Sequence, residues 1–291
     1  IKMQKEKKYA LHLVILIGLI SRVHASIFVI LLGLLFYLLI MKLEKMKIST
    51  SEIEIILFSI FIIFWSQFTM FKKAFLIHGS SIIWQNTPLL YFGSEFAKFN
   101  LATAIYSIGA IPLFFGFYIV FKHLFQKKKR PDYFIISFTI AILFALLFRL
   151  INAKPGFMFL GISLILLFSI YCKSFLAYMK KTKFYKSKYV LMSILLVVFI
   201  FNSIIPSFDL GIRSLDESPS ESEIEAFYWL KENTELNSSV LLSVREGHAL
   251  TYFSNRRNIV DNNFLLIENI DKHLGDLDEI YTTKFLTDAV Y

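Results

Sequence analysis

Three charged side chains border long apolar runs and are candidates for chemistry. Glu95 lies about six residues before the run that begins at Leu101, and Arg149 and Lys154 flank a short break between two further runs. A carboxylate there can bind a metal or form charge-assisted hydrogen bonds, or it can be an ordinary solvated acid. The two cations can hold a phosphate, or they can extend toward lipid headgroups. Both interpretations stay open for each residue.

Four further candidates lie near the C-terminal end of the chain. Gly247 and His248 belong to a polar turn, so His248 is either a substrate contact or a turn residue. Arg256 and Asp261 follow within one short segment, where they either bind a substrate or pair with each other. These four residues predict a substrate-binding surface whose ligand the sequence does not specify.

Metal and thiol chemistry have little support elsewhere. The histidines are scattered without the i, i+4 spacing that is typical of zinc sites. The one cysteine, Cys172, lies inside an apolar run and has no intramolecular disulfide partner. A buried small apolar side chain of this kind needs no function.

The elements that must position these residues are membrane helices. Hydrophobic residues make up 56% of the chain, including 32 Phe, and the mean hydropathy is +0.60. A helix of about 20 apolar residues crosses a bilayer core. We therefore predict a polytopic α-helical membrane protein with about seven spans, over residues 9–20, 26–41, 53–70, 101–123, 133–150, 157–177 and 189–207.

The basic residues predict the orientation of these spans. Lysine and arginine clusters precede the first span and follow the second, fourth and sixth, so with seven spans all of them lie on one side, the cytoplasm. The opposite side receives a loop over about 71–100 and everything after about 207. Residues 1–207 carry a net charge of +18 and residues 208–291 carry −9. The overall +9 therefore reflects loop charges, and we expect no nucleic-acid partner.

Residues 208–291 form the second predicted domain, after the transmembrane domain of residues 1–207. Ser220 to Glu223 is a capping box that opens a helix over about 221–233. Strands are predicted at Ser239–Val244 and Asn258–Val260, with a short helix between them and further helices at Asp271–Ile280 and Thr283–Val290. This order predicts a small extracytoplasmic α/β domain. Because the chain begins with Ile and stops within a helix-like pattern, we expect a truncated domain in a fragment of a longer protein.

Five segments of this domain follow one another over about 40 residues: Ala226–Thr234, Asn237–Leu242, Glu246–His248, Tyr252 and Asn255–Asp261. In order and spacing they resemble the start of the soluble domain in archaeal oligosaccharyltransferase catalytic subunits. These are type C membrane glycosyltransferases, which move a lipid-linked glycan to an Asn side chain. The chain departs from the family at the Trp-Trp-Asp motif, where it has Ser243-Val244-Arg245. This departure predicts a divergent relative with altered acceptor recognition.

The resemblance also implies roles for the residues near the membrane. In the family, a Glu in an external loop lies near the acceptor amide, and Glu95 is similar to it in position. A cation at the external start of a later helix lies near the lipid pyrophosphate, and Lys154, with Arg149 nearby, takes that place. The resemblance implies a divalent metal, Mg or Mn, to which Glu95 is a possible ligand. It places the catalytic Asp before residue 1, so we expect the fragment alone to be inactive.

The expected function is therefore glycan transfer from a polyprenyl-linked donor to a protein or lipid acceptor, in the cell membrane. A transporter is the first alternative. Two features argue against it: the spans contain few charged residues, and the sequence shows no internal repeat. A non-catalytic membrane anchor or assembly protein that displays an external binding domain is the second, and nothing in the sequence excludes it.

Overall fold

A computed structural model describes residues 7–22, 27–126, 130–183, 185–216 and 218–283 of the chain. The chain divides into two compact units. The first consists of residues up to Leu76 and of Leu90–Pro206, and the second of Ile77–Leu89 and the residues from Ser207 onward. The division at Pro206 lies next to the predicted domain boundary. Segment Ile77–Leu89, predicted as part of an external loop over 71–100, belongs to the second unit.

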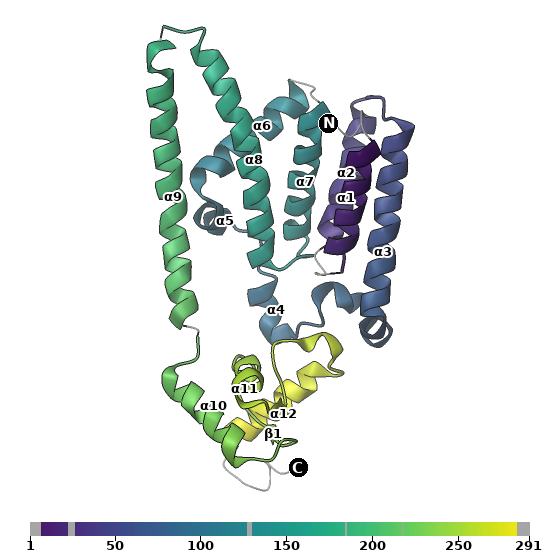
Figure 1. Ribbon diagram of the computed structural model, residues 1–291, viewed down its shortest axis with the longest axis vertical. Helices are drawn as coiled ribbons and strands as arrows, with labels where there is room; N and C mark the ends of the chain where they lie inside the picture. The colour runs from purple at the N-terminus through teal and green to yellow at the C-terminus, as the bar shows by residue number, and fades with distance from the viewer. Residues whose placement is uncertain (1–6, 23–26, 127–129, 184, 217, 284–291) are drawn as a thin grey trace. The chain divides into compact units, whose positions relative to one another are not determined.

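The first unit is a bundle of helices, and Figure 1 shows them side by side. Helices lie over the predicted spans, but the span 101–123 is divided between two helices, α3 continues beyond its predicted end with a kink at Phe71, and α9 also continues beyond its predicted end. The bounds are α1 Lys7–Ile20, α2 Phe28–Leu43, α3 Thr50–His78, α4 Leu89–Glu95, α5 Leu101–Ile108, α6 Ala110–Phe125, α7 Arg130–Leu147, α8 Ala153–Met179 and α9 Lys188–Asp216, with a short 3₁₀ turn at Tyr185–Ser187 (η3). The 3₁₀ turn Gly79–Trp84 (η2), which follows α3, belongs to the second unit.

Several of these helices are long and apolar enough to cross a membrane. Four described stretches meet that condition, and the bent pair α5–α6 makes a fifth if it counts as one span. The four are Thr50–Trp84, Arg130–Leu147, Ala153–Met179 and Tyr185–Pro206. Helices α1 and α2, with 14 and 16 residues, are shorter than the roughly 20 residues of a straight crossing. The fold fits a helical membrane protein.

The core of the first unit lies where α7 packs against α2 and α8, and where α6 packs against α8. Small residues allow the close approach, as is common between membrane helices. At Gly116, an added Cβ would lie 3.2 Å from the backbone oxygen of Leu164 on α8. The buried hydroxyls of Thr139 on α7 and Ser163 on α8 share a hydrogen bond of 2.5 Å. Contacts of this kind fix the relative positions of the central helices.

The predicted span 101–123 is broken in the structure. Helices α5 and α6 meet at an angle of 109° around Gly109, whose φ of 91° favours glycine. The first amide of α6, the Ala110 N–H, donates to Asn202 Oδ1 on α9 at 2.8 Å. An apolar run with one Gly is consistent with a continuous span. The break is stabilised by a hydrogen-bond acceptor, Asn202, that lies 92 residues away in the sequence. The local sequence pattern around Gly109 does not reveal this partner.

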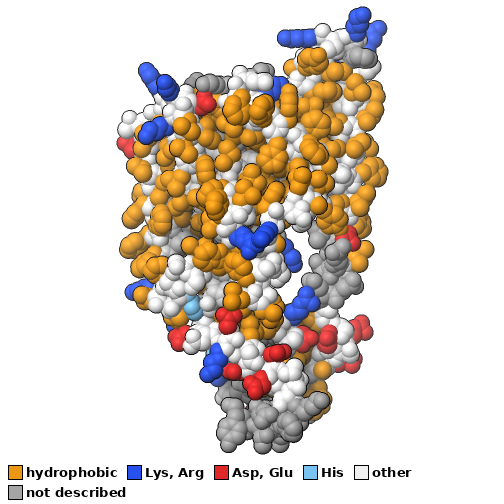
Figure 2. Space-filling view, turned by 180° about the vertical axis from the view of Figure 1, so that it is seen from behind, with side chains coloured by type: hydrophobic (Ala, Val, Ile, Leu, Met, Phe, Trp, Pro, Cys, Tyr) orange, Lys and Arg blue, Asp and Glu red, His pale blue; other side chains and the backbone are white. Residues whose placement is uncertain are grey.

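One end of the helices in the first unit is basic. The C-terminal ends of α2, α6 and α8 meet at this end, beside the starts of α3 and α7 (Figure 1). Lysines in the last turn of α2 and after α2 and α8 are exposed there: Lys42, Lys45, Lys47, Lys180, Lys181, Lys183 and Lys186. Figure 2 shows apolar side chains over the helices and Lys and Arg side chains at their end. We call this the basic end.

The second unit begins its ordered domain with α10, Glu221–Asn233. Its predicted capping box is present, because Ser220 N–H donates to Glu223 Oε2 at 2.6 Å and Glu223 N–H donates back to Ser220 Oγ. Helix α11 (Gly247–Ser254) packs on α10, with Phe227 and Leu250 buried between them. The chain then passes through η4 (Phe264–Leu266) to α12 (Ile270–Thr282).

The sheet of the second unit is much smaller than predicted. Strand β1 is Ser239–Val240 and β2 is Arg257–Asn258, paired in parallel with Ser239 opposite Arg257. Of the expected strand Ser239–Val244 only Ser239–Val240 is paired, and the expected strand Asn258–Val260 overlaps β2 only at Asn258. The expected helix at Thr283–Val290 lies outside the described residues from position 284 onward.

The segment Ile77–Leu89 is tied to the end of the second unit. Asn86, in a left-handed conformation, donates its side-chain amide to the backbone oxygens of Phe264 (2.9 Å) and Ile267 (2.8 Å). The Leu89 N–H lies 3.4 Å from Asp271 Oδ1. Part of the predicted loop therefore acts as a component of the terminal domain.

Candidate functional site

Glu95 is the last residue of α4 and is exposed. The chain after it is anchored, because Phe96 is 1% exposed and Phe99 packs on Phe157 of α8 with ring centroids 5.9 Å apart. Asn100 then caps α5 by accepting from the Ala102 N–H. These buried aromatic contacts hold the Glu95 carboxylate at the edge of the first unit while leaving it open to solvent.

The turn between α7 and α8 lies against this carboxylate. Arg149 takes a left-handed conformation with φ 54°, which is costly for a side chain with a Cβ, and buried Ile151 anchors the turn. Asn152 precedes α8 but makes no side-chain capping hydrogen bond. Its amide Nδ2 instead donates to Glu95 Oε2 at 3.1 Å. Residues 57 positions apart therefore meet at one place.

Arg149 contacts the same helix that carries Glu95. Its guanidinium carbon lies 5.9 Å from the centroid of the Phe92 ring, one turn before Glu95 on α4. This is the geometry of a cation–π contact. We refer to Phe92, Glu95, Arg149 and Asn152 as the Glu95 cluster. It joins α4 to the α7–α8 turn.

Lys154 is exposed in the first turn of α8, two residues after Asn152. The N-terminal end of a helix carries a partial positive charge, so a cation there is unfavourable unless an anion compensates it. Helix α8 has no acidic residue in its first turn. The cluster therefore combines one hydrogen-bonded carboxylate with a flanking positive field from Arg149, Lys154 and the end of α8. Such an arrangement can orient a polar substrate and attract a phosphate.

A divalent metal finds no complete ligand set here. Mg and Mn prefer several oxygen ligands, with carboxylates prominent among them. Within the described ranges, no group of three or more His, Cys, Asp or Glu residues could hold a metal ion. Glu95 would supply one ligand, and the other residues of its cluster do not complete the site.

Gly247, His248 and Asp261 form a second group, in the second unit. His248 Nδ1 lies 3.5 Å from Asp261 Oδ2, and Asn258 Nδ2 donates to the same oxygen at 3.1 Å. Gly247 makes this approach possible, because an added Cβ would lie 2.7 Å from the Val260 backbone oxygen. The His248 side chain is 56% exposed. The sequence candidates therefore meet as an oriented and accessible histidine backed by a carboxylate.

Arg256, in contrast, is 5% exposed and directed into the domain. Its Nη2 donates to the backbone oxygens of Lys231 (2.5 Å) and Thr234 (2.6 Å), and its Nε donates to Thr234 Oγ1 (2.8 Å). The last carbonyls of a helix need such donors. We call this arrangement the Arg256 clamp. Within the described residues Arg256 forms no ion pair with Asp261, so the alternative in which these two residues pair is wrong.

The sequence analysis missed several polar residues that the structure brings together. Asn152 lies in the short polar turn just before Lys154. The drop in hydropathy at this turn is the one sequence feature that points to Asn152. Glu52 follows Ser49 with capping-box spacing and forms an ion pair with Arg130. His123 Nδ1 on α6 lies 2.7 Å from Asp132 Oδ2 on α7. These pairs connect helix ends at the basic end.

Comparison with known proteins adds no assignment. No protein-family model matches the chain, and no curated protein is detectably similar to it.

Proposed function

We propose that this chain belongs to a membrane glycosyltransferase that moves a glycan from a polyprenyl-linked donor to a protein or lipid acceptor. One observation supports the proposal most. The Glu95 carboxylate is hydrogen-bonded to Asn152, which lies between Arg149 in the α7–α8 turn and Lys154 in the first turn of α8. By the resemblance to oligosaccharyltransferases, Glu95 corresponds to an acid near the acceptor, and Lys154 with Arg149 corresponds to a cation near the donor. The two groups must lie close together because donor and acceptor react with each other.

In this proposal the residues have distinct roles. Lys154 and Arg149 attract the phosphates of the donor, and the N-terminal end of α8 adds to their positive field. Glu95 accepts a hydrogen bond from the nucleophilic group of the acceptor and orients it. Toward a divalent metal, Glu95 would contribute one carboxylate ligand. The exposed His248, backed by Asp261, is a separate candidate substrate contact of the second unit.

The proposed topology has seven spans, with α1 and α2 crossing as shorter helices. The basic end then faces the cytoplasm, and the Glu95 cluster and the acidic α/β-type domain face the opposite side. The described basic residues at the ends of α2 and α8 support this orientation because they gather at one end of the first unit.

Single-cysteine labelling in intact cells tests the topology. Cys172→Ala provides the background, and cysteines replace Glu95, Glu225 or Lys47 one at a time. A membrane-impermeant maleimide should label positions 95 and 225 from outside, whereas position 47 should react only after permeabilisation. Labelling of position 95 only after permeabilisation would overturn the topology.

A donor titration in membranes tests the function. Lys154→Gln should raise the KM for a polyprenyl-diphosphate glycan about tenfold, because it removes one charge beside the phosphates. Lys98→Gln, a nearby exposed lysine outside the cluster, serves as the matched control and should leave this KM unchanged. An identical KM for both variants, or no transfer by the wild-type protein with Mg or Mn present, counts against the proposal.

A transporter is the weaker alternative. Broken helices often hold substrates in transporters, and the break between α5 and α6 is such a feature. However, the side chain of Asn202 occupies the α6 end of this break, since a Cβ at Gly109 would lie 2.7 Å from Asn202 Oδ1. The break is therefore filled by the protein itself.

A further inference from the structure

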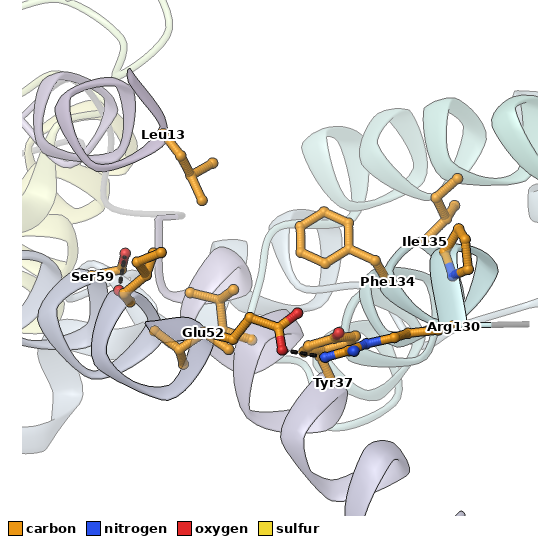
Figure 3. A pocket seen from close by; sticks show the side chains of 11 residues that line it. Leu13, Tyr37, Glu52, Ser59, Arg130, Phe134 and Ile135 are labelled. Atoms are coloured by element: carbon orange, nitrogen blue, oxygen red, sulfur yellow. Dashed lines mark hydrogen bonds and ion pairs between the residues drawn. The ribbon is translucent and has the colours of Figure 1, made fainter. Parts of the chain in front are cut away.

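Two cavities follow one another along α7 in the first unit. The first has a volume of about 370 Å³ and is lined from α1, α2, α3 and α7, as Figure 3 shows. The second has a volume of about 420 Å³ and is lined from α1, α2, α7 and α8. Phe134 and Ile135 line both cavities. We call the two together the α7 groove.

The length of the α7 groove matches one leaflet of a bilayer. Its lining runs along α7 from Arg130 to Ile142, which is roughly 18 Å at the helical rise of about 1.5 Å per residue. Half of a hydrocarbon core of about 30 Å is similar in depth. Away from Arg130 and Glu52 the described lining residues are mainly aliphatic and aromatic, with the hydroxyls of Ser59 in the first cavity and Ser163 in the second. An apolar chain can therefore lie in it along its length.

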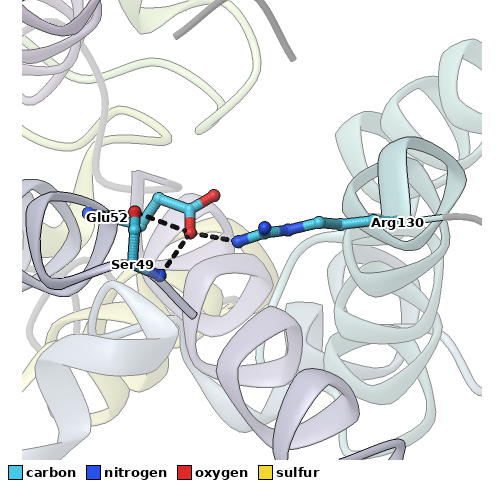
Figure 4. A network of polar contacts seen from close by, with 3 residues as sticks. All are labelled: Ser49, Glu52 and Arg130. Atoms are coloured by element: carbon cyan, nitrogen blue, oxygen red, sulfur yellow. Dashed lines mark hydrogen bonds and ion pairs between the residues drawn. The ribbon is translucent and has the colours of Figure 1, made fainter. Parts of the chain in front are cut away.

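The groove has a polar mouth at the basic end. Arg130 and Glu52 form an ion pair there, and Ser49 N–H donates to the same Glu52 carboxylate (Figure 4). Figure 3 shows Tyr37, Glu52 and Arg130 together at the cavity, which all three side chains line. The Arg130 side chain is 30% exposed, so solvent and headgroups reach it. A guanidinium at the mouth of an apolar groove suits a phosphate above an acyl chain.

The charge around the mouth selects an anionic ligand. In the sequence Arg130 directly follows Lys127-Lys128-Lys129, and the exposed Lys42, Lys45 and Lys47 follow α2 at the same end. Basic residues beside a membrane attract anionic lipids of the cytoplasmic leaflet. The Glu95 cluster lies beyond the other end of α7, after Leu147, so the groove mouth is separate from the proposed donor site.

We propose that the α7 groove binds an anionic phospholipid of the cytoplasmic leaflet, with one acyl chain along α7 and its phosphate at Arg130. This inference goes beyond the proposed function. The proposed topology is needed only to assign the groove to the cytoplasmic leaflet. Glu52 competes with the phosphate for the guanidinium, so lipid binding exchanges one partner of Arg130 for another and loosens the link between α3 and α7.

Fluorescence quenching by brominated lipids tests this proposal without any activity assay. The full chain carries Trp65→Phe, Trp84→Phe and Trp229→Phe, with Phe134→Trp as the reporter inside the groove. In mixed vesicles, brominated phosphatidylglycerol should quench this reporter with a relative affinity about fivefold above brominated phosphatidylcholine, the worth of one basic residue near an anionic surface. Phe64→Trp, on a side chain that is 62% exposed on α3, is the matched control and should show no preference.

Variants at the mouth separate a specific site from ordinary lipid contact. Arg130→Gln should abolish the preference at position 134, Arg130→Lys should retain most of it, and Glu52→Gln should increase it. The proposal is overturned by equal quenching from both lipids, by a preference that survives Arg130→Gln, or by an unquenched reporter, the sign that protein covers the groove. Displacement of brominated phosphatidylglycerol by equimolar polyprenyl phosphate would also overturn it.

Discussion

The Glu95 cluster and the Arg256 clamp hold charged side chains in opposite situations. Arg256 is almost fully buried, and its guanidinium donates to backbone oxygens and one hydroxyl within its own domain. Glu95 is exposed and accepts one side-chain hydrogen bond, from Asn152. The first arrangement stabilises a fold, whereas the second leaves a charge accessible to a ligand. Burial and hydrogen-bond partners therefore separate structural from functional candidates that look alike in the sequence.

The largest effect is expected at the clamp. Arg256→Ala should leave several carbonyls without donors and destabilise the second unit by about 3 kcal/mol. Hydrogen exchange of the full chain should then show lost protection over the last turn of α10. Arg257→Ala removes the exposed neighbouring charge and should change protection little. If Arg256→Ala and Arg257→Ala change protection equally, the Arg256 clamp does not stabilise the end of α10.

The turn that positions His248 should be nearly as sensitive. Gly247→Ala forces a Cβ to within 2.7 Å of the Val260 backbone oxygen and 2.8 Å of Asp261 Cβ. We expect a loss of about 2 kcal/mol in the unfolding free energy of the full chain. Gly275→Ala in α12 meets nothing within 4 Å and should stabilise the domain by about 0.5–1 kcal/mol. If Gly247→Ala stabilises the protein as Gly275→Ala does, the backbone around Gly247 does not approach it as closely as the structure indicates.

A smaller loss is expected where α9 meets the helix break. Asn202→Leu removes the acceptor of the Ala110 N–H within an apolar region and should cost about 1–2 kcal/mol. Thermal unfolding of the purified protein in detergent measures this effect. Ser203→Ala is the control, since Ser203 Oγ bonds to Phe199 within its own helix. If the Asn202 variant unfolds at the wild-type temperature, the break is held by other contacts.

The smallest effect concerns the acidic start of α10. Hydrogen bonds from the Ser220 backbone and hydroxyl lower the pKa of Glu223 below its ordinary value of 4.5. The ionised form is therefore favoured by folding, and its stabilisation is present above pH 4.5 and lost as the pH falls below that value. Exchange protection of the first turn of α10 should decline over this range in the wild-type protein. Glu223→Gln should abolish this decline, whereas Glu225→Gln should preserve it. A decline that persists in Glu223→Gln, or that is lost in Glu225→Gln, would contradict the capping assignment.

The sequence predicted local features well and long-range contacts poorly. The capping box at Ser220 and helix α10 were predicted to the residue, because the signal lies within four consecutive positions. The break at Gly109 was missed because its stabilising partner, Asn202, belongs to another helix. Which of Arg256 and Arg257 is buried depends on a β2 register that the sequence does not fix. Glu95 was a candidate, but its partner Asn152 was not, since only the fold brings the α7–α8 turn to α4.

The most direct test of the central claim is the rate of glycan transfer by Glu95→Gln in native membranes, with Mg or Mn and saturating donor. The substitution preserves size and retains an acceptor for Asn152, so stability should change by less than about 0.5 kcal/mol. We predict a kcat at least roughly tenfold lower than that of wild type at equal protein abundance, because the charge that orients the acceptor is lost. Lys98→Gln, three residues away, should transfer at the wild-type rate. A Glu95→Gln protein that transfers as fast as this control would contradict the assignment of the Glu95 cluster as the functional site.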